Sequence, residues 1–108
     1  TAIFAASDIQ AVGVLEAARS LNIAVPDDLS LIGYDDIELA ELLELSTIQQ
    51  PMKYMGELGA QKLIAQIEDS LVGESAPELI RLQTRLVMRR TVAGLPPLSE
   101  ASQANLRE

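Results

Sequence analysis

The sequence predicts an α/β fold in which helices flank a parallel sheet. Short apolar runs at residues 2–6 and 29–33 have the length and composition of buried strands. A segment with helix-start signals lies between them, and a strand–helix–strand order predicts a right-handed parallel crossover. Of the 108 residues, 48% are apolar, which favours a packed core over disorder.

The helix between these two strands should begin immediately after Ser7. Ser7 and Gln10 form a capping-box pattern, and Asp8 in the first turn suits the positive end of the helix dipole. The helix should run to about Leu21, because Asn22 readily takes the left-handed conformation that ends helices.

The second half of the chain should contain further helices and strands joined by extended segments. Proline at position 51 disfavours helix just before it, and alternation of apolar and polar residues after position 78 indicates a strand. The expected elements are a short helix at Glu38–Leu45, an extended segment at 46–51, a long helix at Met52–Leu71, a loop at 73–77, a strand at Leu79–Arg90 and a tail from about 94 onward.

Charge and composition exclude several classes of function for this part of the chain. Sixteen acidic residues against eight basic ones give a net charge of −8, so contact with a nucleic-acid backbone is not expected. Cysteine and histidine are absent, which removes disulfides and the commonest metal ligands, so we expect no metal and no cofactor. The absence of cysteine is compatible with a reducing cytoplasm. No apolar run suggests a membrane span or a signal peptide.

Carboxylates follow both predicted strands at the point where each strand ends. Ser7 and Asp8 follow the first strand, and Asp35 and Asp36 follow the second. In open parallel sheets, ligands bind just beyond the carboxyl ends of the strands. We therefore expect Asp8 and Asp35 to converge at one edge, facing a cleft. The alternatives are that Ser7 and Asp8 are only a helix-capping pair, that the two aspartates form a solvated turn, and that Asp36 braces a loop.

Three blocks of sequence resemble the ligand-binding core of the lactose-repressor/galactose-repressor (LacI/GalR) family of bacterial transcription regulators. The blocks are IFAASDIQAVGVLEAARSLNIAVPDDLSLIGYDD, STIQQPMKYMGELGAQKLI and RLVMRRTV, and they match in order and spacing over roughly residues 1–93. The resemblance implies part of a two-lobed periplasmic-binding-protein-like (type I) fold. It also implies that the chain, which starts inside an apolar run, is the C-terminal part of a longer protein whose DNA-binding domain is absent here.

The resemblance implies a division of the chain between two lobes. Residues 1–50 should belong to the C-terminal lobe, residues 51–74 should cross to the N-terminal lobe, and residues 75–93 should return as a strand. Residues 94–108 remain as a tail. Contact with DNA would come only through the missing N-terminal helix-turn-helix. We therefore expect Arg89 and Arg90 to pair with nearby carboxylates instead of contacting DNA.

The same resemblance implies that Ser7, Asp8, Asp35 and Gln50 hold a sugar or another small polar effector, such as a nucleobase. The chemistry suits this role, because a carboxylate accepts several hydroxyl hydrogen bonds and an amide offers both a donor and an acceptor. No catalysis is expected. Two alternatives stay open: a periplasmic sugar-binding transport protein, and a hydrolase that uses the paired carboxylates.

Apolar residues outside the expected core indicate an association surface. On a helical wheel Val14, Leu15, Ala17, Ala18 and Leu21 share one face, whereas Ile9 and Val12 lie outside it. The short helix predicted at Glu38–Leu45 has more apolar residues than a surface helix of that length requires for packing. Exposed apolar groups of this kind mark association sites. The family resemblance implies a homodimer through Ile9, Val12, Leu39, Leu42 and Leu43. The alternative is burial of these residues against the missing lobe or the tail.

Overall fold

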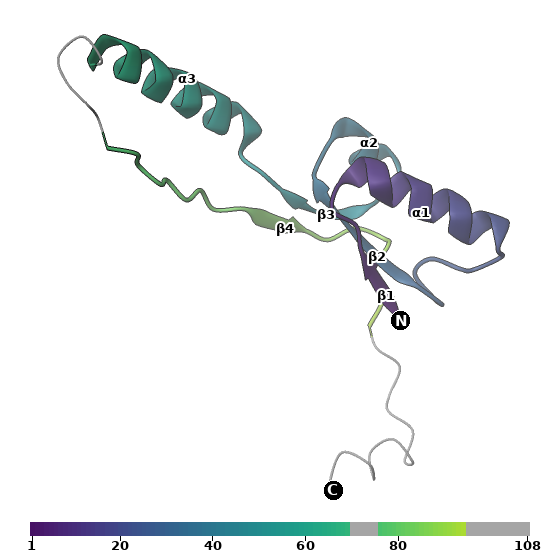
Figure 1. Ribbon diagram of the computed structural model, residues 1–108. Coiled ribbons are helices and arrows are strands. Elements are labelled where there is room, and N and C mark those ends of the chain that lie inside the picture. The colour runs from purple at the N-terminus through teal and green to yellow at the C-terminus, as the bar shows by residue number, and fades with distance from the viewer. Residues whose placement is uncertain (70–75, 95–108) are drawn as a thin grey trace, which may run out of the picture.

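One four-stranded sheet organises the structure, a computed structural model that describes residues 1–69 and 76–94 (Figure 1). Strands β1 (Ala2–Phe4), β2 (Ser30–Asp35) and β3 (Ser46–Gln49) run parallel in that order, and β4 (Arg85–Val87) pairs with β3 in the antiparallel direction. The predicted parallel pairing is confirmed. The three parallel strands end toward the same side of the sheet, which we call the carboxyl edge.

Helix α1 (Asp8–Ser20) begins and ends where its sequence signals place it. The Ser7 hydroxyl accepts a hydrogen bond from the Gln10 N–H at 3.2 Å, which satisfies one of the free donors of the first turn. Asn22 has a φ of 55°, the left-handed conformation that was predicted to end the helix.

Helix α2 (Glu38–Leu42) is shorter than the predicted Glu38–Leu45. Glu44 takes a φ of 52°, and its N–H donates to the carbonyl of Glu41 at 3.1 Å. The N–H of Leu45 donates to the carbonyl of Ala40 at 2.8 Å, which completes a Schellman ending. The sequence carries no signal for this ending, because glycine usually occupies the left-handed position.

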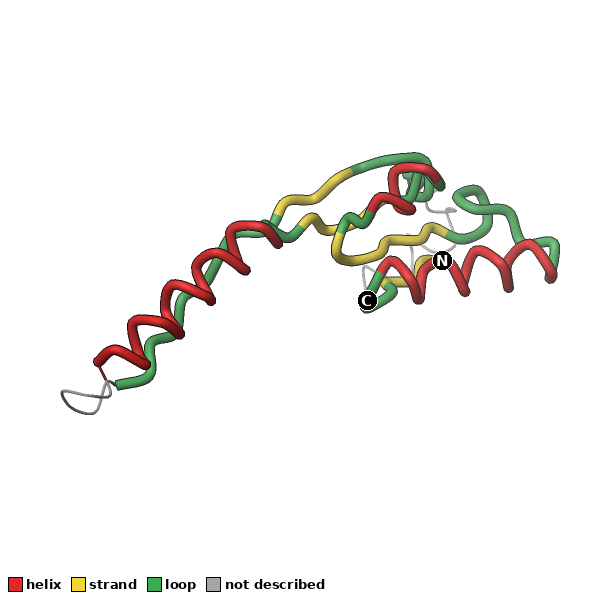
Figure 2. Tube along the Cα trace, turned by 90° about the horizontal axis from the view of Figure 1, so that it is seen from above, coloured by secondary structure: helices red, strands yellow, loops and turns green. Residues whose placement is uncertain are grey.

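Helix α3 (Met52–Asp69) and the extended residues 76–84 form an arm that projects from the sheet (Figures 1 and 2). Lys62 contacts Glu78 at 2.5 Å across this arm. The Cα radius of gyration is 20.8 Å, against about 13 Å for a compact domain of this length. The predicted helix end at Leu71, part of the 73–77 loop and nearly all of the tail lie outside the described residues.

The other strand boundaries differ from the prediction in informative ways. The first strand is shorter than residues 2–6, and β2 runs two residues past Gly33 to Asp35. The predicted strand at Leu79–Arg90 is reduced to the three residues of β4, because β3 offers only Thr47–Gln49 as ladder partners. Residues 79–84 are extended without belonging to a strand.

The core lies on one face of the sheet, where α1 and α2 cover β2. Leu31 is fully buried, and it belongs to a cluster with Ala5, Ala11, Ala40 and Leu45. Leu21 does not join this core, since its side chain is 69% exposed. On the opposite face a cavity of about 290 Å³ opens, and its lining is almost wholly apolar: Ala2, Ile3, Ser30, Leu31, Ile32, Leu86, Met88 and Val92.

Within residues 1–69 and 76–94, helices are too short or too polar to cross a lipid bilayer.

Candidate functional site

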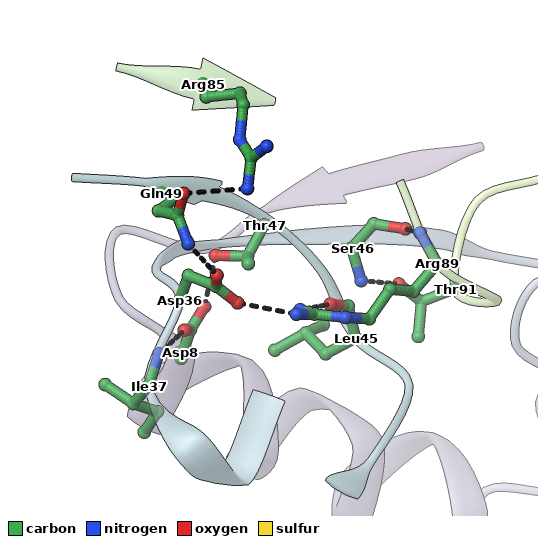
Figure 3. Close-up of polar contacts among 10 residues, drawn as sticks. All are labelled: Asp8, Asp36, Ile37, Leu45, Ser46, Thr47, Gln49, Arg85, Arg89 and Thr91. Carbon is green, nitrogen blue, oxygen red and sulfur yellow. Dashed lines mark hydrogen bonds and ion pairs between the residues drawn. The ribbon is translucent and has the colours of Figure 1, made fainter. Parts of the chain in front are cut away.

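The carboxylate of Asp8 is buried beneath the carboxyl edge, with 1% of the residue exposed. Its Oδ2 atom accepts the backbone N–H of Ile37 at 3.0 Å, and its Oδ1 atom accepts the Thr47 hydroxyl at 2.6 Å (Figure 3). Ile37 lies in the loop after β2 and Thr47 lies in β3. Asp8 therefore joins the start of α1 to both neighbouring segments of the edge.

Gly33 leaves the space that the buried carboxylate needs. A Cβ atom built on Gly33 would lie 2.3 Å from the Asp8 Oδ1 atom and 3.2 Å from the Leu45 Cδ2 atom. Because Oδ1 is held by the Thr47 hydroxyl, it has little freedom to move aside. The glycine in the sequence Ile-Gly-Tyr is therefore required by close approach.

Asp35, the last residue of β2, lies half-buried at the edge, and its carboxylate accepts one described hydrogen bond. The Gln50 side-chain amide donates to its Oδ1 atom at 2.6 Å. Its Oδ2 atom has no hydrogen-bond partner among the described residues. The backbone of Asp35 has a φ of 114°, a value that side-chain-bearing residues rarely adopt.

Asp36 sits at the centre of a network of side chains (Figure 3). Its Oδ1 atom lies 2.8 Å from the Arg89 Nη2 atom, and its Oδ2 atom accepts the Gln49 amide at 2.6 Å. Gln49 in turn accepts a hydrogen bond from Arg85 at 2.9 Å. The interpretation that Asp36 braces a loop is confirmed by these contacts.

The two adjacent arginines pair with carboxylates of the chain, as predicted. Arg89 pairs with Asp36, and the Arg90 Nε atom lies 3.1 Å from a Glu44 carboxylate oxygen. Sequence patterns did not identify Ile37 and Thr47 as the partners of Asp8, or Gln49 and Arg89 as the particular partners of Asp36, because these contacts join segments apart in the chain. Within residues 1–69 and 76–94, no three carboxylates gather in a way that could hold a metal ion.

The structure brings together some of the predicted site residues and separates others. Asp35 and Gln50 are in direct contact. Ser7 is half-buried and caps α1. The expectation that Asp8 faces an open cleft beside Asp35 is corrected: Asp8 is buried, and both its oxygens accept hydrogen bonds from the protein, which offsets the cost of that burial. The role of these four residues as ligand contacts stays a prediction.

Most of the residues predicted to form a dimer interface are exposed. The exposed fractions are 65% for Ile9, 36% for Leu39, 81% for Leu42 and 39% for Leu43, and Val12 is half-buried. Ile9 lies in the first turn of α1, whereas the leucines belong to α2 and its C-terminal end. Both helices pack on the same core through other residues, Ala11 and Ala40. The exposed side chains therefore lie on the outer surface of the two helices, where a partner could contact them.

Comparison with known proteins gives concordant matches. Residues 1–92 match the family described as periplasmic binding protein-like domain. The HTH-type transcriptional repressor PurR of Vibrio parahaemolyticus is 38% identical over 97 residues, which cover 88% of this chain and 28% of that protein. The ribose operon repressor of Halalkalibacterium halodurans is 37% identical over 94 residues, covering 85% and 28%.

A solved structure with the same arrangement is a LacI family transcriptional regulator from Enterococcus faecium with bound ribose. It superposes with a TM-score of 0.76 at 33% identity, covering 89% of this chain and 36% of that one. The chain thus spans a little over a quarter of the length of the curated relatives it matches.

Substitution of Gly33 by alanine should destabilise the fold. We expect a loss of about 1–3 kcal/mol in the free energy of unfolding, because the added methyl overlaps the fixed Asp8 carboxylate. Urea denaturation would measure it. Gly13→Ala is the matched control, since nothing lies within 4 Å of its added Cβ in α1. That control should gain about 0.5–1 kcal/mol. Equal effects of the two substitutions would contradict the steric argument.

Substitution of Asp8 should reveal its two hydrogen bonds. Asp8→Ala leaves the Ile37 N–H and the Thr47 hydroxyl without their acceptor, at a cost of about 1–3 kcal/mol for each unsatisfied group. Asp8→Asn should lose less, because its amide group can accept from Ile37 and donate to the Thr47 oxygen. Thermal and urea unfolding would rank the variants, with exposed Asp27→Asn as the control. An alanine variant as stable as the parent would show that these bonds contribute nothing.

Proposed function

We propose that this chain, which belongs to the LacI family of transcriptional regulators with a periplasmic-binding-protein-like domain, is the effector-binding and dimer-forming part of a DNA-binding repressor. The observation that carries the proposal is the match of residues 1–92 to that domain, together with curated relatives that are repressors. The effector would be a sugar or a similar small polar molecule. A ribose-bound structural neighbour supports this class.

The effector contact would centre on Asp35 and Gln50. Asp35 keeps an oxygen without a partner among the described residues, and it lies half-buried at the carboxyl edge, where parallel sheets bind ligands. Gln50 already donates to Asp35, so its amide oxygen can accept from a ligand hydroxyl. Ser7, the N-cap of α1, would add a hydroxyl. Asp8 would act by holding Ile37 and Thr47 in place.

The arm would carry the signal between two lobes. Residues 1–50 would form the C-terminal lobe, 51–74 would cross to the N-terminal lobe, and 75–93 would return. Support comes from α3 and residues 76–84, which leave the sheet and come back side by side (Figures 1 and 2). Closure of the lobes on an effector would change DNA affinity through the dimer, a coupling typically of about 1–3 kcal/mol.

Contact with DNA would belong to a helix-turn-helix segment outside residues 1–108. The acidic character of this chain supports that division, since its net charge is −8. A repressor of this kind would act in the cytoplasm, where bacterial DNA lies. We assign no catalytic step to the paired carboxylates, because Asp36 is neutralised by Arg89 and Asp8 is buried.

A homodimer would form through Ile9 and Val12 of α1 and Leu39, Leu42 and Leu43 of α2. The support is their exposure, with 81% of Leu42 open to solvent on a short helix that packs on the core through Ala40. Burial of such side chains is the usual driving force of association.

Binding of a small polar effector should depend on the Asp35 carboxylate. The protein would be the native polypeptide, including its flanking segments. We would titrate it with D-ribose, other sugars and nucleobases, and record the melting temperature. Asp35→Asn keeps the shape and an oxygen for Gln50 but removes the charge, so affinity should fall by about 10- to 100-fold. Exposed Asp27→Asn should bind as the parent does. Absence of stabilisation by every compound, or unchanged affinity of Asp35→Asn, would contradict the proposed site.

Dimer formation should be lost when a charge replaces an interface leucine. Leu42→Asp would place a carboxylate in the apolar contact, so analytical ultracentrifugation should show a monomer where the parent shows a dimer. Leu21→Asp is the control, because Leu21 is also exposed, at 69%, but lies at the C-terminal end of α1, at the other end of the helix from Ile9. A monomeric parent, or a Leu42→Asp variant that remains dimeric, would exclude this surface.

A further inference from the structure

Two consecutive residues after the core of β2 have positive φ angles, and neither is glycine. The angles are 114° at Asp35 and 58° at Asp36. Residues with side chains populate this region sparsely, and they remain there only where surrounding contacts determine the backbone. The φ of Asp35 sets the direction in which its side chain leaves β2, and the φ of Asp36 sets the path of the backbone that follows. The contacts that hold them are therefore part of any function of Asp35.

Arg89 holds one side of this strained pair through Asp36. Its guanidinium has two partners in different segments: Nη2 lies 2.8 Å from the Asp36 Oδ1 atom, and Nη1 donates to the Leu45 carbonyl at 2.9 Å. The Arg89 and Asp36 side chains are only 18% and 9% exposed, so water screens the ion pair weakly. The Arg89 N–H also donates to the Ser46 hydroxyl at 2.8 Å. A planar, two-pronged group is needed to reach both partners at once.

The other side of the pair is held by Asp8, which accepts the N–H of Ile37. The backbone from Asp36 to Ile37 is thus fixed from two directions, by groups 53 and 29 residues away in the chain. Both carboxylate oxygens of Asp36 accept hydrogen bonds from protein donors, and the same is true of Asp8. Asp35 differs, since one of its oxygens has no partner among the described residues.

We propose that Arg89 is a positioning residue for effector recognition: by binding Asp36 and Leu45 together, it imposes the backbone that aims Asp35 at Gln50. Arg89 follows β4, so it also connects the returning segment of the arm to Asp36, the neighbour of the carboxylate that would contact the effector. The structural part of this proposal stands on the contacts above, and its consequence for ligand affinity rests on the proposed function.

The first test measures the backbone of this chain without any ligand. A positive φ brings a residue's amide proton close to its own α proton, which gives a strong intraresidue NOE. In Arg89→Met the strong NOEs of Asp35 and Asp36 should be lost, and amide exchange at Ile37 should accelerate by about tenfold, the factor for one lost charged hydrogen bond. Arg89→Lys keeps the charge without the two-pronged group, so it should recover these signals only in part.

Arg90→Met is the matched control, because Arg90 pairs with Glu44 at the surface with its side chain 81% exposed. It should leave all these signals unchanged. If Arg89→Met lowers the unfolding midpoint but keeps both NOEs, Arg89 only stabilises the fold and the proposal is overturned. Should the variant fail to fold, Asp36→Asn tests the same contact from the other partner, with the same expected loss of the NOE at Asp35.

The second test asks whether this geometry matters for binding. The native polypeptide is titrated with D-ribose and the other sugars and nucleobases used for Asp35→Asn. Arg89→Met should weaken binding of the responding compound by about tenfold, although residue 89 does not contact that compound. Arg90→Met should leave the affinity unchanged. If the parent binds none of them, the proposed function fails while the NMR result still decides the positioning role. Unchanged affinity in Arg89→Met, with the NOEs lost, would overturn the link between the two.

Discussion

The buried carboxylate of Asp8 is the interaction on which the rest of the carboxyl edge depends. It satisfies the Ile37 N–H and the Thr47 hydroxyl, and it needs the bare backbone of Gly33 beside it. These contacts fix the first turn of α1 against the loop after β2 and against β3. A buried charge is costly unless it is fully hydrogen-bonded, so this arrangement tolerates little change in any of its partners.

Three carboxylates share one edge of the sheet, yet each has a different environment. Asp8 is buried with neutral donors, Asp36 is paired with Arg89, and Asp35 is half-buried with a glutamine. Placing like charges close together is unfavourable, and the arginine offsets part of that repulsion. The outcome is that a single carboxylate, Asp35, keeps an oxygen that the described protein groups do not use. Recognition of a polar ligand at this edge would therefore be specific to one position.

The two faces of the sheet are covered differently, and the arm joins the sheet at its carboxyl edge. Strand β2 carries apolar residues toward both of its faces, as parallel strands covered on both sides do. Here α1 and α2 cover the face of Leu31, while the face of Ile32 lines an open apolar cavity. The arm meets the carboxyl edge through Gln49, Gln50 and Arg85, which are also the residues that contact the aspartates or their partners. The residues that join the arm to the sheet therefore also carry the contacts that hold the edge.

The sequence alone determined the features that depend on neighbouring residues. The cap at Ser7, the left-handed Asn22 and the parallel order of strands that brings polar residues to one edge all follow from short patterns. Long-range packing sets which aspartate is buried and which is open, and it brings Arg89 onto Asp36 from 53 residues away. It also ends α2 at Leu42, where Glu44 takes the left-handed conformation just after the helix. Local signals select helices and strands, whereas the partner of a charged side chain is set by long-range packing that no local pattern encodes.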